Sequence, residues 1–449
     1  MASKSGITRA PLFAVLGYVV LTFVLFLAWP IDWPIYGAWD WTNLVLYVLM
    51  CLFVLYVGAM TGSAGSTQLA APLPGIKLLL AAGAAASAAL LIPSCLAYTG
   101  RGPWELMDAL QNQGEAYRRL QIQLYFGEGQ RAFMVAMRFL AGPLMYAVLP
   151  LGVIHWRRIG WLGRAAVGVA VACSIVFSIM RGTDKEIADL FVIGVAALLV
   201  SMGRAMTLSR SRSQLARRYW LPAILGVAFL FAAQGLFTER KDERLGGIEN
   251  KALVCANNSR ICADIDHPVI AWLPLRERFG LSVFILSTSS GYFGLHLALE
   301  KPFESSLGVG HSPAALSVYE AATGDEKPHR RTYTYRNGFD QWPEESYWST
   351  LITWIANDIG FAGAVAVLGL LGFAWGLWWR EAAAGMSDPA AVLFVQATTM
   401  VFYLPANNQV FAAYEGYSIF FAWLAIWWWH RSTRRVFAAL PIAAPEPAR

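Results

Sequence analysis

The sequence has few charged residues and none of the short motifs that mark the common soluble enzymes. Only 14% of its 449 residues are charged, whereas 57% are hydrophobic. It contains no Walker loop, no dinucleotide-binding glycine fingerprint, no zinc-protease helix and no nucleophile elbow. These absences exclude the common soluble chemistries and ATP-driven transport. No internal repeat of the kind that transporters tend to show is visible.

Cysteine is also scarce, with five in the chain. Cys255 and Cys262 are seven residues apart in a polar segment, which favours a disulfide if that segment lies in an oxidising compartment. A metal site that includes the nearby His267 is the alternative, but it lacks a fourth ligand at a suitable spacing. We therefore expect a disulfide, no metal and no cofactor. Three cysteines in or near apolar segments should behave as small apolar residues; they are Cys51, Cys95 and Cys173.

Long apolar runs dominate the remainder. Runs of about 17–25 residues can cross roughly 30 Å of hydrocarbon as helices. The first run is too long for a secretory signal core and has no small-residue cleavage site after it, so we interpret it as a retained helix. The sequence thus predicts an all-α polytopic membrane protein. The ten expected spans are 11–29, 42–60, 75–97, 132–153, 165–180, 187–202, 220–237, 356–379, 390–404 and 411–429.

Arginine is concentrated in alternate loops between these spans. The loops 154–164 and 203–219 and the tail after 430 are rich in arginine, whereas carboxylates gather in the other loops. This positive-inside asymmetry places both termini in the cytoplasm and the long polar segment outside the membrane. It also argues against a nucleic-acid partner, because the basic residues act as topology signals.

The spans divide the chain into four parts. Residues 1–237 hold seven spans, residues 238–355 form a large exterior loop, residues 356–430 hold three spans, and residues 431–449 form a cytoplasmic tail. The exterior segment 99–130 reads as an amphipathic interfacial helix. Its expected apolar face comprises Leu106, Leu110, Tyr117, Leu120 and Leu124.

Segment 281–299 within the large exterior loop is apolar enough to enter a membrane. It nevertheless contains several serines and glycines and His296. A full crossing would reverse the charge rule for every later span. We therefore expect a re-entrant or interface-lying helix that lines a cavity.

Charged residues near the outer ends of spans are the candidates for chemistry. Arg138 lies two turns inside its span, where a charge is costly and usually faces a cavity. Arg181, Asp184 and Lys185 crowd a tight turn, and guanidinium groups bind phosphate oxygens in a bidentate manner. Such groups suit a lipid pyrophosphate, although anchoring at the membrane interface is an open alternative for exposed arginines. Further candidates are Arg276, Arg278, Arg336 and Asp358.

His311 is the best-placed general base among the histidines. It follows the flexible stretch Gly308-Val309-Gly310, just after the apolar segment 281–299. A hydrogen-bonded loop histidine without a catalytic role is the alternative.

Four stretches resemble bacterial oligosaccharide repeat-unit polymerases of the O-antigen (Wzy) type. They are GEAYRRLQIQ (114–123), SIMRGTDKEI (178–187), GYFGLHLALEKPFESSLGVGHS (291–312) and YWSTLITWIANDIGFAGAVAVLGLLGFAWG (347–376). The resemblance implies a polytopic, GT-C-like, metal-independent inverting glycosyltransferase in the bacterial inner membrane, which makes the exterior loop periplasmic. Such an enzyme moves a growing glycan from undecaprenyl pyrophosphate onto the next lipid-linked repeat unit, with a chain-length regulator as a possible partner protein.

Carried onto this sequence, the resemblance implies roles for individual residues. Arg181 and Lys185 would bind the leaving pyrophosphate, and His311 or an acidic neighbour would activate the acceptor hydroxyl. Arg276 and Arg278 would help to hold phosphate or sugar. Tyr292, in the third matched stretch, joins the substrate-binding candidates. An O-antigen ligase, a flippase or transporter of lipid-linked sugars, and a structural subunit are the alternatives.

Overall fold

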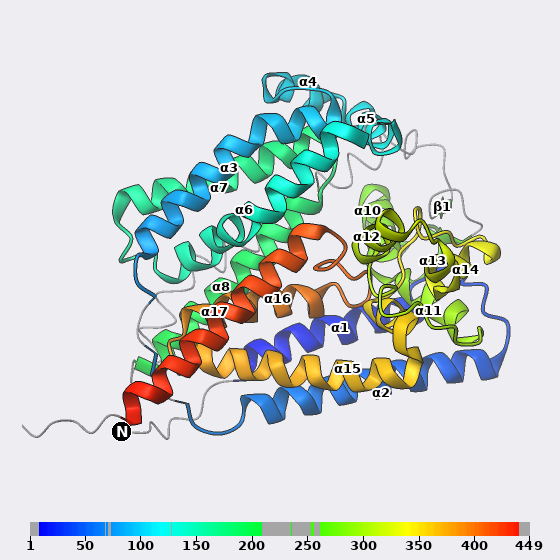
Figure 1. Cartoon of the computed structure of the whole chain (residues 1–449). Coiled ribbons are helices and arrows are strands. Elements are labelled where there is room, and N and C mark those ends of the chain that lie inside the picture. The colour runs from blue at the N-terminus through cyan, green and yellow to red at the C-terminus, as the bar shows by residue number, and fades with distance from the viewer. Residues whose placement is uncertain are drawn as a thin grey trace, which may run out of the picture.

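The computed structural model describes residues 9–67, 69–70, 73–126, 128–208, 235, 253–255 and 261–439. Within these residues the chain is almost entirely helical (Figure 1), and eight segments are long and apolar enough to cross a membrane. The protein is therefore a polytopic helical membrane protein, as expected. The eight segments are α1 (Ala10–Ala28), α2 (Ala38–Ser63), α3 (Ile76–Thr99), Arg131–Ile154 of α6 (Glu128–Ile154), α7 (Gly160–Met180), Lys185–Thr207 of α8 (Lys185–Leu208), Leu275–Leu299, and α15 (Leu351–Ala383).

Two further expected spans are helical but are not among these eight segments. α16 (Asp388–Phe402) has only 15 residues, and α17 (Tyr414–Ala439) carries polar residues at both ends. α16 is buried on all sides from Asp388 to Val401, as a helix that is apolar all round should be. The expected span 220–237 lies outside the described residues, apart from Gly235, so the total of ten spans stays a prediction.

Glycine brings α2 and α15 into backbone contact. A Cβ on Gly62 would lie 2.0 Å from the carbonyl oxygen of Phe373, and one on Gly376 would lie 2.2 Å from that of Ala59. Gly58 and Gly372 are equally close to the facing backbone. Each helix therefore carries a pair of glycines spaced four apart. This small-residue spacing lets membrane helices approach closely when there is no hydrophobic driving force between them.

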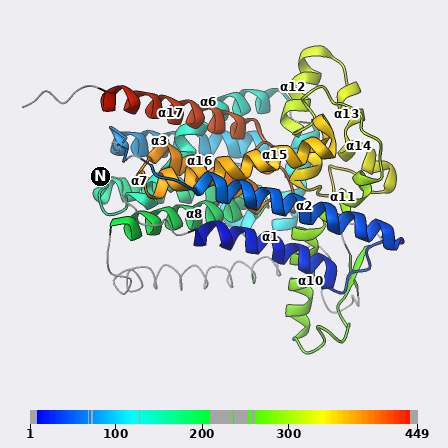
Figure 2. The ribbon, with the colours of Figure 1, turned by 90° about the horizontal axis from the view of Figure 1, so that it is seen from below.

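A cluster of short elements covers one end of the bundle, away from the start of α1 and the end of α17 (Figure 2). Residues with side-chain oxygens cap several helices here: Ser312 accepts from the Ala315 amide at 3.1 Å, and Thr332 from the Tyr335 amide at 3.1 Å. The cluster comprises β1 (Leu253–Cys255), β2 (Cys262–Asp264), α10 (Leu275–Ser289), α11 (Gly291–Leu299), α12 (Pro313–Thr323), α13 (Lys327–Arg331) and α14 (Tyr333–Asn337).

β1 and β2 pair antiparallel, with Cys255 opposite Cys262. These two cysteines form the expected disulfide. Among the described residues, β1 and β2 are the only regular elements that are not helical. It closes the hairpin that leads into α10.

The segment expected to be one helix over 281–299 forms two helices that meet at Ser290. α10 lies across the direction of the bundle helices (Figure 2), and 72% of the most apolar window of Leu275–Leu299 is buried inside the protein. By length and composition alone this segment could cross a membrane. Its orientation across the bundle agrees with an interface-lying helix, which stays a prediction because the structure contains no membrane.

The segment 99–130 also forms more than one helix, with α4 (Leu106–Gln111) followed by α5 (Gln113–Phe126). Ala109 and Ala116 are buried against α3 and α7, and Leu120 is buried as well. Leu110 and Tyr117, which were expected on the same apolar face, are exposed. The buried residues Ala109, Gln113, Ala116 and Leu120 are spaced three or four apart, so the buried face keeps one helical periodicity and lies beside the face that was expected.

Candidate functional site

A break in α15 frees a backbone carbonyl at the end of its first segment, and a neighbouring loop donates a hydrogen bond to it. Gly360 has φ +71° and ψ 174°, a conformation that only glycine adopts without strain, so the helical hydrogen-bond ladder is interrupted there. The carbonyl of Asn357 is consequently free for another donor, and Ser306 Oγ donates to it at 2.7 Å. This bond holds loop 305–312 against the break.

Loop 305–312 surrounds the carboxylate of Asp358 with hydrogen-bond donors. The amide of Gly310 donates to Oδ1 at 2.7 Å, and the amide of His311 donates to Oδ2 at 3.0 Å. Ser306 Oγ lies 2.5 Å from Oδ1, so its single proton is shared between this oxygen and the Asn357 carbonyl. A Cβ on Gly310 would lie 2.0 Å from Ser306 Oγ, so this approach requires glycine. These donors compensate a negative charge whose side chain is only 9% exposed.

His311 is held between Asp358 and Tyr417. Its Nδ1 lies 2.9 Å from Asp358 Oδ2, and its Nε2 lies 2.6 Å from the Tyr417 hydroxyl. Since a carboxylate only accepts, we assign the ring proton to Nδ1, which leaves Nε2 as an acceptor. The Tyr417 hydroxyl also lies 2.7 Å from Ser312 Oγ. With 32% of its side chain exposed, His311 has the orientation of a general base that can take a proton from a hydroxyl group.

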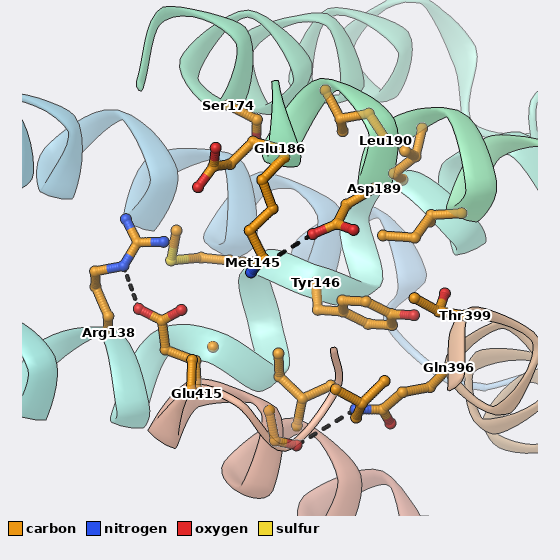
Figure 3. A pocket seen from close by; sticks show the side chains of 18 of the residues that line it. Arg138, Met145, Tyr146, Ser174, Glu186, Asp189, Leu190, Gln396, Thr399 and Glu415 are labelled. Atoms are coloured by element: carbon orange, nitrogen blue, oxygen red, sulfur yellow. Dashed lines mark hydrogen bonds and ion pairs between the residues drawn. The ribbon is translucent and has the colours of Figure 1, made fainter. Parts of the chain in front are cut away.

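A cavity of about 230 Å³ lies within the bundle, lined by residues of α3, α6, α7, α8, α16 and α17 and of the segment before α17. Two of the predicted cations, Arg138 and Lys185, both line it. Three carboxylates line it as well, namely Glu186, Asp189 and Glu415. Figure 3 shows Arg138 and Glu415 pointing toward one another at one side of the cavity, with Asp189 on the other side.

Both cations of the cavity have carboxylate partners. Arg138 Nε donates to Glu415 Oε1, and Lys185 Nζ lies 3.8 Å from Asp189 Oδ2. Pairing lowers the cost of placing these charges inside a membrane bundle. An anionic ligand would therefore reach either cation by exchanging with a carboxylate.

Arg181 lies at the tip of the turn that joins α7 and α8. It pairs with Glu186 and stacks over the ring of Phe177, 5.1 Å from its centroid. Gly182, with φ +61°, packs so closely on α5 that a Cβ would lie 2.5 Å from the Tyr117 amide nitrogen. Two of the stretches that carry the family resemblance are thus in contact. Asp184 lies in the same turn, and its carbonyl accepts from the Ala188 amide at 3.0 Å.

The segment 405–417 joins the cavity to the His311 cluster. Asn408 Nδ2 donates to the carbonyl of His311 at 2.6 Å, and the next residue, Gln409, lines the cavity. In the first turn of α17, Glu415 contacts Arg138 and Tyr417 contacts His311. The candidate base and the charged cavity therefore belong to one connected site.

Arg276 and Arg278 do not line this cavity. Arg278 donates to the carbonyls of Leu273 at 2.6 Å and Ala271 at 2.7 Å, and its Nη1 lies 3.2 Å from Asp266 Oδ1. It thereby fastens the turn that precedes α10. Arg276 is exposed on the first turn of α10.

Arg336 and Tyr292 also have structural contacts away from the cavity. Arg336 donates to Glu304 Oε1 at 2.9 Å and to the Pro302 carbonyl at 2.8 Å. Tyr292 is fully buried, and its hydroxyl lies 3.2 Å from Thr22 Oγ1. Neither residue is placed to contact a ligand in the cavity.

Glu415, Tyr417 and Gln396 belong to the site but were not predicted. Glu415 and Tyr417 fall in the expected span 411–429, whose apolar composition hides them. The polar run 405–417 between two apolar segments, with a carboxylate at the start of a helix, is the signal that could have identified them.

Among the described residues, no group of three or more His, Cys, Asp or Glu side chains is placed to hold a metal ion. Comparison with protein-family models, curated proteins and solved structures found no match for this chain.

Proposed function

We propose that the protein polymerises undecaprenyl-pyrophosphate-linked oligosaccharide repeat units at the periplasmic face of the bacterial inner membrane. The observation that carries the proposal is the connection between the Asp358–His311 pair and a cavity that contains Arg138 and Lys185. Glycosyl transfer from a pyrophosphate requires a base for the acceptor hydroxyl and cations for the leaving group. Here one short segment joins the two. The resemblance to Wzy-type polymerases supports the same reaction.

In the proposed reaction, His311 is the general base. The acceptor sugar hydroxyl replaces the Tyr417 hydroxyl at Nε2, approaching within about 3 Å. Its proton passes to Nε2 while its oxygen attacks the anomeric carbon of the donor sugar from the face opposite the leaving group. The bond between that carbon and the pyrophosphate oxygen breaks, and the lipid pyrophosphate leaves with the electron pair. Asp358 orients the imidazole and stabilises the imidazolium that forms.

Arg181, Lys185 and Arg138 are assigned to the leaving pyrophosphate. Negative charge grows on its oxygens as the bond breaks, and cations held in place lower the barrier without a metal ion. Before the substrate binds, Glu186 and Glu415 keep the arginines compensated. The pyrophosphate then exchanges with these carboxylates, so the site carries no bare positive charge when it is empty.

The proposed orientation has both termini in the cytoplasm and the cluster α10–α14 in the periplasm. The start of α1 and the end of α17 lie at the same end of the bundle, opposite that cluster (Figure 2), which supports this orientation. A chain-length regulator is the proposed partner protein.

Transport of a lipid-linked sugar is the second candidate function. The depth of the cavity favours transport. Its lining runs along α8 from Lys185 to Ile193, which is about 12 Å at a helical rise of 1.5 Å per residue. Transporters bind substrate inside the bundle, whereas a polymerase needs only the end where the substrate headgroup lies. The His311 pair, which transport does not require, favours the polymerase.

An assay with purified full-length protein tests the proposal. The protein is reconstituted in liposomes with an undecaprenyl-pyrophosphate-linked repeat unit from the parent organism, and the lipid-linked products are separated by size. Wild type and a His267→Ala control should give a ladder of longer glycans, and His311→Ala should not. Transfer to a lipid A–core acceptor alone would indicate a ligase, and leaflet exchange without new glycosidic bonds would indicate a transporter.

A further inference from the structure

The inner part of the cavity, defined here by Tyr146, Asp189, Gln396 and Thr399, contains buried polar atoms with unused acceptor capacity. Among the described residues, Asp189 Oδ1, Gln396 Oε1 and the Tyr146 hydroxyl lack a hydrogen bond of good geometry, although Tyr403 and Gln409 lie near the Asp189 carboxylate and Thr399 lies near the Tyr146 hydroxyl. Gln396 is only 2% exposed. A buried polar group without a partner destabilises a protein. These atoms therefore indicate a ligand that supplies the missing bonds.

The unpaired atoms are mainly hydrogen-bond acceptors. Asp189 Oδ1 and Gln396 Oε1 can only accept, and the Tyr146 hydroxyl can accept or donate. A phosphate oxygen without a proton also only accepts, so a pyrophosphate cannot satisfy them. The ligand of the inner cavity must supply O–H or N–H donors.

The serine and threonine hydroxyl groups on the cavity wall also present only acceptors to a ligand. Ser87 Oγ donates to the Gly83 carbonyl at 2.9 Å, and Ser174 Oγ to the Ala170 carbonyl at 3.1 Å. Thr399 Oγ1 donates to the carbonyl one turn back in α16 at 3.1 Å. Since each hydroxyl proton is used within its own helix, only oxygen lone pairs remain available to a ligand.

The ligand of the inner cavity is also expected to be neutral. In the protein without bound phosphate, Asp189 has Lys185 as its cation and Arg138 has Glu415 (Figure 3), so these pairs leave no net charge for the ligand to balance. Apolar side chains complete the lining, among them Leu149. Hydroxyl groups along the edge of a ring and C–H groups on its faces are the features of a sugar. At about 230 Å³ the cavity is smaller than pockets for drug-sized ligands, which occupy about 300–1,000 Å³.

We propose that this inner part of the cavity is a binding subsite for one uncharged sugar residue. Asp189, Gln396 and Tyr146 recognise its hydroxyl groups, whereas Arg138 and Lys185 of the same cavity are assigned to phosphate. The assignment of this sugar to the lipid-linked substrate rests on the proposed function. The preference of the subsite for a hydroxyl-rich, uncharged ring is independent of the proposed function.

Saturation-transfer NMR on the full-length protein in nanodiscs tests this subsite. The probes are a panel of methyl hexosides and methyl N-acetylhexosaminides, with inorganic pyrophosphate as the competitor. At least one glycoside should receive saturation from wild type and keep it in the presence of pyrophosphate. The signal should fall at least fivefold in Tyr146→Phe, which removes one oxygen atom, and in Gln396→Met, which preserves the side-chain length. Tyr56→Phe, on the exposed face of α2, is the matched control.

Equal signals in wild type, Tyr146→Phe and Gln396→Met would overturn the subsite, as would loss of the signal with pyrophosphate or no binding of any glycoside. Normal melting temperatures of the variants establish that the loss is local. The polymerisation assay separates the two proposals. If a His311-dependent ladder forms but no glycoside binds, only the subsite is wrong. If the glycoside binds in a Gln396-dependent manner but His311→Ala still polymerises, only the proposed role of the base is wrong.

Discussion

Glu415 and Tyr417 lie two residues apart in the first turn of α17 and contact different functional groups. Glu415 accepts from Arg138 at the cavity, and the Tyr417 hydroxyl lies 2.6 Å from His311 Nε2. Arg138 and the candidate base His311 therefore both have a partner in the same helical turn. A substitution in this turn should affect both ligand binding and proton transfer.

Asp358→Asn should lower the rate of polymer formation by about 10²–10⁴, the range that general acid–base groups contribute. The amide can neither fix the Nδ1 proton of His311 nor stabilise the imidazolium. Because the two residues act as one unit, Asp358→Asn combined with His311→Ala should be no slower than His311→Ala alone. Product yield at equal protein level measures the effect. Multiplicative losses in the double variant would contradict the pairing.

Arg181→Ala should lower the rate about 10²–10³-fold while the protein still accumulates in the membrane, by analogy with the loss of one fixed donor to a developing charge. Arg181→Lys should recover only part of this loss, because the planar fork is absent. Glu186→Gln, which frees the arginine from its partner, should keep activity. Arg119→Ala breaks an exposed ion pair with Glu115 and serves as the control. If Arg181→Ala forms polymer at the wild-type rate, this turn has no role in phosphate binding.

His329 should make the stability of the cluster α10–α14 depend on pH. A hydrogen bond with Glu344 raises the pKa of His329 to about 9 against the effect of burial, and Glu320 acts in the same direction. The raised pKa stabilises the fold fully below about pH 6.5, and this contribution is lost as the pH rises through about 9. We expect a loss of about 2 kcal/mol, less than the full linkage value because the ring is partly exposed.

Limited proteolysis of the purified protein between pH 6 and 10 measures this dependence. Wild type should be cleaved faster in the cluster as the pH rises. His329→Gln should be cleaved at a rate that changes little with pH, and His267→Gln should behave like wild type. A pH response that persists in His329→Gln would assign it to another group.

Gly376→Val should prevent α2 and α15 from packing. Its first added carbon would lie 2.2 Å from the Ala59 carbonyl oxygen, which is backbone and cannot turn aside. We expect a loss of at least 1–3 kcal/mol, about the cost of overpacking a core, seen as a lower melting temperature in detergent. Gly17→Val is the matched control, since nothing lies within 4 Å of a Cβ there. Equal melting temperatures for the two variants would rule out the close contact.

Single cysteines test the orientation in the membrane. In a background without reactive native thiols, Lys327→Cys in α13 should react with an impermeant thiol reagent in cells with a permeabilised outer membrane. Arg157→Cys, between α6 and α7, should react only after the inner membrane is opened, because the arginine-rich loops are predicted to be cytoplasmic. Labelling of Arg157→Cys from outside would reverse the proposed topology.

The long helices could be predicted from the sequence because hydrocarbon requires about twenty apolar residues in each span, a signal local to the chain. His311 and Asp358 were both identified as candidates, but their contact depends on the break at Gly360, and the sequence does not show which glycine will interrupt a helix. Arg278 and Arg336 were candidates whose contacts prove to be structural. Their residue type suits phosphate, yet nearby carbonyls and carboxylates bind them, and those partners become visible only in three dimensions.

Gln396 and Tyr146 could not have been identified in advance, since each lies in a mostly apolar helix and nothing in the sequence separates it from the other polar residues there. Such residues often have partners on neighbouring helices. Only the structure shows that both residues line a cavity and that their oxygen atoms keep unused acceptor capacity there.

The break at Gly360 also separates the two segments of α15 mechanically. The segment after it packs on the glycines of α2, and the short segment before it carries Asp358. A bilayer of different thickness tilts the helices that span it. Because the hydrogen-bond ladder is interrupted between the two segments, such a tilt is not passed on to Asp358 as rigid rotation. The geometry of the candidate base should therefore depend little on the acyl-chain length of the surrounding lipid.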